Sequence, residues 1–168
     1  MNAVYDGLDD VAELLKNAGA DSSRYGDVLL FRAIMQDDDA DLARKAFMQG
    51  ANPNCQFMTG CSALWLAAFH GCAKIIEILV QAGAQVPLDA LLPLGEMDIT
   101  DWKIDPIELE VDYARVAEIL LEHGASPHVT AHNGQPLITT FPERSYPSIH
   151  RVLAEAISRQ IPHSEKSP

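Results

Sequence analysis

The sequence of 168 residues has only three cysteines, and their spacing is unpaired. Cys55, Cys61 and Cys72 are an odd number, so we expect no disulfide framework. A zinc site would need a fourth ligand at a suitable spacing. His128 and His132 are four residues apart, but they fall in an expected hairpin rather than on one helix face. We therefore expect no metal and no cofactor.

Basic residues are also scarce. Twelve Lys and Arg residues stand against 24 Asp and Glu residues, which gives a formal net charge of −12. Phosphate backbones and anionic membrane surfaces repel such a protein, so we expect neither as a partner. A partner protein with a basic patch would be attracted at long range. The alternative is that the acidic surface only keeps the protein soluble.

The sequence also lacks an 18-residue apolar run, which predicts no membrane span. Its first ten residues contain no basic residue and no apolar core typical of a signal peptide, so we expect a cytoplasmic protein. No G-x-S-x-G, phosphate-binding glycine loop or H-E-x-x-H motif occurs. We therefore expect a protein that is not an enzyme.

What recurs instead is a helical ending closed by Gly-Ala. The glycines are Gly19, Gly50, Gly83 and Gly124, which lie 31, 33 and 41 residues apart. A glycine can adopt the left-handed conformation that ends a helix. Near-constant spacing of such endings predicts a repeat protein.

One repeat carries a recognisable motif. Residues 60–71, GCSALWLAAFHG, resemble the ankyrin pattern G-x-T-P-L-H-x-A-A-x-x-G, and residues 78–84, ILVQAGA, resemble its closing segment. The resemblance implies an all-α fold, an ankyrin-repeat solenoid of stacked helix pairs with helical caps and short or missing hairpins. The implied organisation is one domain over residues 1–161, with a cap at 5–19, repeats at about 26–50, 60–83, 86–124 and 134–158, and a disordered tail at 162–168.

The third repeat departs from the pattern. Residues 86–95 resemble the motif again, with Asp89 where the family usually has His, but about nine residues of the preceding hairpin are missing. About 17 residues are inserted between its two helices. In the last repeat, Ser148 is a plausible N-cap of the final helix.

Ankyrin arrays bind other proteins through hairpin tips and inner helices. We expect a partner to bind at the matching positions Met58, Phe69, His70 and His132, and at Phe57, which neighbours Met58. Large apolar side chains at exposed positions are typical interface anchors. The alternative is structural: Phe57 would pack against an adjacent hairpin, and Phe69 would pack under the next repeat.

The insert at residues 95–112 is a second candidate. Its acids are Glu96, Asp98, Asp101, Asp105, Glu108, Glu110 and Asp112. We expect Asp98, Asp101, Trp102 and Asp105 to bind a partner, with Trp102 as an anchor among carboxylates. Alternatively, the apolar residues of the insert pin it onto the outer helices while the acids face outward.

A run of acids at residues 37–41 lies at the equivalent place in the first repeat. Its simplest interpretation is that Asp38 or Asp39 caps the next helix and the others favour its N-terminus. Stacking of the repeats nevertheless predicts that this run and the insert form an acidic rim along one edge.

These features predict a non-catalytic protein-binding module, monomeric when free, that inhibits or occludes a partner with a basic surface. An immunity protein that neutralises a toxin would fit. The alternatives are a regulatory adaptor, similar to the small ankyrin inhibitors of kinases, and, less in keeping with the sequence, an enzyme or metal-binding protein.

Overall fold

The computed structural model describes residues 23–36, 38–57, 60–95 and 106–160. Its elements in chain order are α2 (Ser23–Met35), α3 (Ala40–Met48), α4 (Ala63–Phe69), α5 (Ala73–Gln81), α6 (Leu92–Gly95), α7 (Pro106–Glu122), the 3-10 helix η1 (Leu137–Thr140) and α8 (Pro147–Gln160). The predicted N-terminal cap at residues 5–19 and the tail at 162–168 lie outside the described residues.

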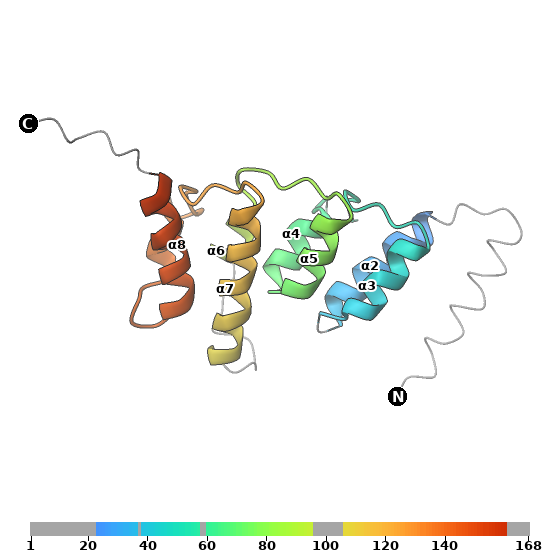
Figure 1. Ribbon diagram of the computed structural model, residues 1–168, viewed down its shortest axis with the longest axis horizontal. Coiled ribbons are helices and arrows are strands. Elements are labelled where there is room, and N and C mark those ends of the chain that lie inside the picture. The colour runs from blue at the N-terminus through green and yellow to red at the C-terminus, as the bar shows by residue number, and fades with distance from the viewer. Residues whose placement is uncertain (1–22, 37, 58–59, 96–105, 161–168) are drawn as a thin grey trace, which may run out of the picture.

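The helices form antiparallel pairs that stand side by side in chain order (Figure 1). The inner elements α2, α4, α6 and η1 contact one another in series, and so do the outer helices α3, α5, α7 and α8. Each pair therefore buries its apolar side against its neighbours, as in a repeat protein. The predicted all-α solenoid of stacked helix pairs is confirmed.

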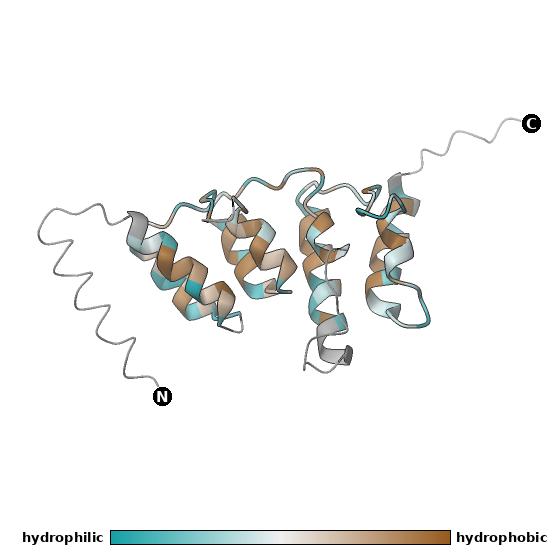
Figure 2. Ribbon diagram, turned by 180° about the vertical axis from the view of Figure 1, so that it is seen from behind, coloured by the Kyte–Doolittle hydropathy of each residue, from teal (hydrophilic) through white to brown (hydrophobic). Residues whose placement is uncertain are grey.

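The second pair, α4 and α5, shows why these residues form helices. The hydroxyl of Ser62 accepts a hydrogen bond from the backbone N–H of Trp65 at 3.1 Å and so caps the start of α4. Gly71 and Gly83 follow the two helices with φ angles of 70° and 91°, a region that favours glycine. Ile75, Ile76 and Leu79 of α5 are fully buried. Seen from behind, this pair is brown along most of its length (Figure 2).

Two hairpins precede helix pairs in the described chain. One is closed by a bridge between Gln56 and Ser62, the other by a bridge between Thr130 and Pro136. Gly60 and Gly134 occupy the turns with positive φ. No equivalent bridge precedes α6 among the described residues, which agrees with the expected loss of the third hairpin.

The third pair is remodelled more than the sequence predicted. Its inner helix α6 has only four residues, whereas α7 has 17 residues against nine in α5. Part of the expected insert is therefore not a loop but an extension of the outer helix by about two turns. Leu88 matches the motif position of Leu64, yet its side chain is 72% exposed where Leu64 is 4% exposed. No hairpin covers Leu88, because the hairpin that would do so is missing.

The prediction that Ser148 caps the last helix is wrong. Helix α8 begins at Pro147, and the backbone N–H groups of Ser148 and Ile149 both donate to the carboxylate of Glu110 on α7. The cap thus comes from the extended part of the neighbouring outer helix. Glu110 is 9% exposed, so the expectation that all acids of the insert face outward is also wrong for this residue.

Candidate functional site

Helix α2 presents an exposed apolar stripe. Val28, Phe31 and Met35 are 60%, 41% and 49% exposed. They lie three and four residues apart, so they share one side of the helix. Large apolar side chains grouped on a surface in this way mark interaction sites more often than single exposed ones do.

Phe57 extends this stripe toward the hairpin that precedes α4. Its ring lies 5.0 Å from that of Phe31 at an interplanar angle of 68°, a favourable edge-on arrangement. Phe57 remains half-buried, so part of its ring is open to solvent. It therefore packs against α2 of the preceding repeat.

Helix α4 carries the next part of the surface. Trp65 and Phe69 stack with ring centroids 5.2 Å apart and an interplanar angle of 10°, and His70 meets Phe69 edge-on at 5.4 Å. All three are half-buried. Burial lowers the pKa of His70, which therefore stays neutral at physiological pH.

Together these side chains form what we call the apolar row: Val28, Phe31, Met35, Phe57, Trp65 and Phe69. Trp65 and Phe69 occupy the positions in α4 that Phe31 and Met35 occupy in α2, and the two helices are in contact. Sequence reasoning selected Phe57 and Phe69 but did not select Phe31 or Trp65. The signal was present, because both stand where the family pattern has a polar His.

A small hollow continues the surface beside Trp65. It measures about 80 Å³ and lies between the start of α4 and the turn that leads into α6. Its walls include the side chains of Leu64, Trp65 and Pro87, and Asp89 lies on its rim. The missing third hairpin leaves this place open.

The other predicted residues are not part of this surface. His132 is exposed at the tip of the hairpin that precedes η1, on the far side of the third pair from Phe57. Met58, Asp98, Asp101, Trp102 and Asp105 lie outside the described residues.

The acidic run of the first repeat has structural roles. Asp39 caps α3 by accepting the backbone N–H groups of Asp41 and Leu42 at 3.1 and 2.9 Å, as one interpretation predicted. Asp38 has a left-handed backbone, φ 57°, and reaches the next repeat, where it accepts the N–H groups of Lys74 and Ile75 at 3.1 and 2.9 Å. This second cap, across the repeat interface, was missed by sequence reasoning.

Asp38 belongs to the expected acidic rim, and its pKa is affected by a second acid of that rim. Burial is the main cause that raises the pKa of Asp38, and the negative charge of Asp112 on α7 contributes to the same direction. Asp38 and Asp112 are therefore near enough for their charges to interact. Of the other acids of the expected rim, Glu110 is buried, and Asp37, Glu96, Asp98, Asp101 and Asp105 lie outside the described residues.

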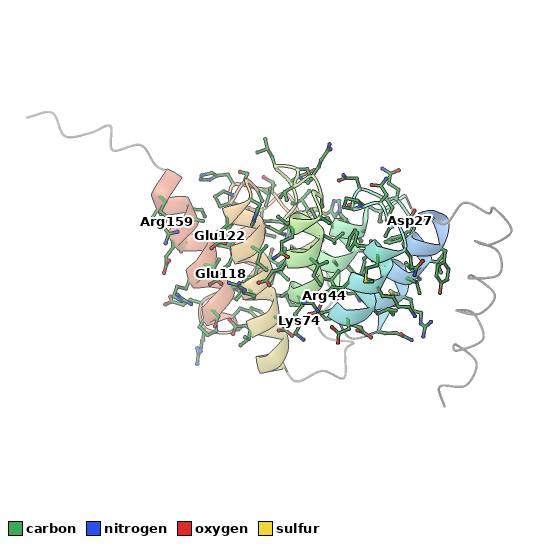
Figure 3. All side chains as sticks on the ribbon, turned by 45° about the vertical axis from the view of Figure 1, so that its right-hand side comes forward. Asp27, Arg44, Lys74, Glu118, Glu122 and Arg159 are labelled. Atoms are coloured by element: carbon green, nitrogen blue, oxygen red, sulfur yellow. The ribbon has the colours of Figure 1, made fainter. Side chains whose placement is uncertain are left out.

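The outer face differs in character from the apolar row. Figure 3 labels Arg44 on α3, Lys74 on α5 and Arg159 on α8 along this side. Its charges are largely paired: Arg44 with Asp41 at 2.9 Å, for example, and Arg159 with Glu155 at 3.2 Å. A shallow groove of about 390 Å³ between α7 and α8 is lined by charged side chains of both signs, including Glu118, Glu122 and Arg159. Exposed ion pairs of this kind contribute little energy and select no single type of partner.

The described residues offer little chemistry for catalysis. Burial, reinforced by the charge and side-chain hydrogen bond of Asp27, raises the pKa of Cys55 to about 12, so its thiol stays protonated and unreactive. Within the described ranges, no three His, Cys, Asp or Glu side chains gather closely enough to hold a metal ion. None of the helices there has the length and hydrophobicity that a bilayer crossing requires.

Stacked helix pairs with an apolar inner surface define a class of repeat proteins whose extended surfaces recognise other macromolecules. Residues 59–90 match the family model of the ankyrin repeat. The matched segment includes the end of the hairpin before α4, helices α4 and α5, and the turn before α6. Residues 59–90 therefore form an ankyrin repeat, which is consistent with an ankyrin repeat protein, and ankyrin repeats are protein–protein interaction modules. No curated protein matches the sequence.

Proposed function

We propose that this protein is a non-catalytic binder that occludes or inhibits a partner protein by covering it with the apolar row. The observation that carries the proposal is the exposure of Val28, Phe31 and Met35 on one side of α2, next to the half-exposed rings of Phe57 and Trp65. Aromatic and Met side chains are enriched at the centres of interfaces, where they supply most of the binding energy.

The helices hold this surface in place before a partner arrives. The rings of Phe31 and Phe57 pack against each other across two repeats, and those of Trp65 and Phe69 stack within one helix. Rings already fixed by such contacts lose little conformational entropy when a partner covers them, and preorganisation of this kind increases affinity. A surface that binds without rearranging suits a stoichiometric inhibitor.

The charge of the chain indicates the partner's surface. A net charge of −12 attracts a protein with a basic patch and speeds its association at low salt. An immunity protein that neutralises a basic toxin has this requirement, because it must bind fast and tightly. We therefore favour this function over a regulatory adaptor.

The test starts from a partner captured from the native host with the full chain and identified by mass spectrometry. Phe31→Ala combined with Met35→Ala should weaken binding of that partner at least tenfold, about 1.4 kcal/mol. The matched control is Met48→Ala, because Met48 is 83% exposed but lies on α3 of the outer layer. Equal affinities for the double variant, the control and the wild type would rule out the apolar row as the binding surface.

The charge part of the proposal has its own test. Reversing Asp98, Asp101 and Asp105 to Lys should slow association mainly at low salt, because steering acts over a Debye length. Trp102→Ala should raise the dissociation rate if Trp102 is an anchor. Unchanged rate constants would limit the binding surface to the apolar row.

A further inference from the structure

The missing third hairpin leaves a gap in the edge where hairpins precede the helix pairs. The Gln56–Ser62 and Thr130–Pro136 bridges stand on either side of it, before α4 and before η1. Between them the chain passes from Gly83 to α6 without a bridge in the described residues. The backbone carbonyl of Leu88 accepts the N–H of Ser126 at 2.8 Å, so the turn is anchored in this position.

The gap exposes apolar surface that a hairpin would otherwise cover. Leu88 is 72% exposed, and the adjacent hollow of about 80 Å³ is walled mainly by Leu64, Trp65, Pro87 and Ala90. Leu64 and Ala90 are themselves buried, so the walls belong to the core and keep their shape. The hollow is thus a fixed apolar socket at the end of the apolar row.

The size of the socket selects its occupant. An apolar cavity of roughly 150 Å³ holds benzene, and this socket has about half that volume. A hollow of this size fits one aliphatic side chain better than an aromatic ring. An extended turn would fit the width that one absent hairpin leaves.

The rim adds a charge requirement. Asp89 is exposed beside the socket, and its carboxylate has no hydrogen bond or ion pair within the described part of the chain. A basic side chain next to the inserted aliphatic one would pair with it. The net charge of −12 favours the same sign in the partner.

We propose that this socket receives a turn of the partner protein that inserts one Leu, Ile, Val or Met side chain, flanked by Lys or Arg, in place of the absent hairpin. The inference rests on the proposed function, since the turn belongs to the protein that the apolar row covers. It names a chemistry for that partner that the apolar row alone does not specify.

The test uses a phage-displayed library of disulfide-closed peptides with random loops, selected against the full chain. The enriched loops should place an aliphatic residue next to Lys or Arg. Their affinity should fall at least tenfold for Ala90→Leu, whose added methyl groups fill the socket, and for Asp89→Lys, which reverses the rim charge. Ala154→Leu on α8 is the matched control and should bind as the wild type does.

Far-UV circular dichroism checks that each variant is folded. If Ala90→Leu does not fold, Asp89→Lys still decides the result, because Asp89 is exposed. The inference is overturned by a library without binders, by loops with aromatic residues in the aliphatic position, or by loops indifferent to both variants. A native partner that depends on Phe31 and Met35 but ignores both socket variants would overturn this inference alone. Dependence on both socket variants without dependence on Phe31 and Met35 would overturn the proposed role of the apolar row and leave the socket as the binding site.

Discussion

The second and third helix pairs solve the same packing problem in different ways. In the second, a bridged hairpin and a seven-residue inner helix precede a nine-residue outer helix. In the third, the inner helix shrinks to four residues while the outer helix grows to 17. Both outer helices still bury one fully inaccessible face, formed by Ile75, Ile76 and Leu79 in α5 and by Val116 and Leu120 in α7.

The difference shows which part of a repeat holds the solenoid together. The outer-helix face is kept, whereas the hairpin is lost. The extra turns of α7 add contacts to both neighbouring repeats: Glu110 caps α8, and the hydroxyl of Tyr113 donates to the backbone carbonyl of Phe69 at the end of α4. The hairpin edge that is lost becomes the open socket, so stability and binding are separated within one repeat.

The largest effect should come from the core of the regular pair. Leu79→Ala in α5 should cost about 3–4 kcal/mol of unfolding free energy, because a fully buried leucine leaves a cavity in a well-packed helix. Leu91→Ala, equally buried beside the short α6, should cost about 2 kcal/mol, because a four-residue helix relaxes more easily. Urea denaturation followed by circular dichroism measures both. A larger loss for Leu91→Ala would reverse the comparison.

The next largest loss of stability should come from removing the cap that Glu110 of α7 provides for α8. Glu110→Ala leaves the N–H groups of Ser148 and Ile149 without their acceptor and should cost about 2 kcal/mol. Glu110→Gln keeps one acceptor oxygen and should cost less. Glu122→Ala, exposed on the same helix, is the control, with an expected change within about 0.5 kcal/mol. If Glu110→Ala behaves as this control does, the extension of α7 does not stabilise its contact with α8.

Alanine substitutions at Gly71 and Gly83 compare the two ends of the second helix pair and should have smaller effects on stability. Gly71 and Gly83 both have positive φ, so alanine at either should cost about 1 kcal/mol. At Gly71 the added Cβ would also lie 3.2 Å from the ring of Tyr113, so Gly71→Ala should lower the thermal midpoint more than Gly83→Ala does. The Tyr113→Phe background tests the role of the hydroxyl. Equal midpoints for the two glycine variants would show that the ring of Tyr113 does not pack closely against Gly71.

The smallest effect should come from the charges that join the two pairs. Arg115 on α7 lies 2.7 Å from Glu77 on α5 and 3.3 Å from Glu118, with all three side chains substantially exposed. Arg115→Ala should cost below about 1 kcal/mol, and the loss should shrink in high salt because exposed pairs are screened. A large loss that persists in high salt would contradict this view of the interface.

Local patterns made the regular repeats predictable. Ser62 before an apolar run, and the glycines after α3, α4, α5 and α7, specify starts and ends within a few residues of sequence. The interface caps were not predictable in this way, because Asp38 and Glu110 act on residues 36–39 positions away. The shortened α6 was missed because residues 86–95 match the family motif, while the missing hairpin removed the packing that would make them helical.

The same limit applies to the binding surface. Phe69 could be selected because the family pattern places an exposed residue there, and Phe57 because it neighbours such a position. The contact between Phe31 and Phe57, and the socket beside Trp65, depend on how two repeats meet, which no single repeat specifies. A side chain's neighbours across a stack follow from the geometry of the stack and not from the sequence around it.

Hydrogen–deuterium exchange of the full chain, free and bound to its captured partner, tests the central claim most directly. The account predicts that binding slows exchange in α2, α4 and residues 86–92, and leaves α3 and α8 unchanged. Protection confined to the outer helices, with α2 and α4 unaffected, would contradict it.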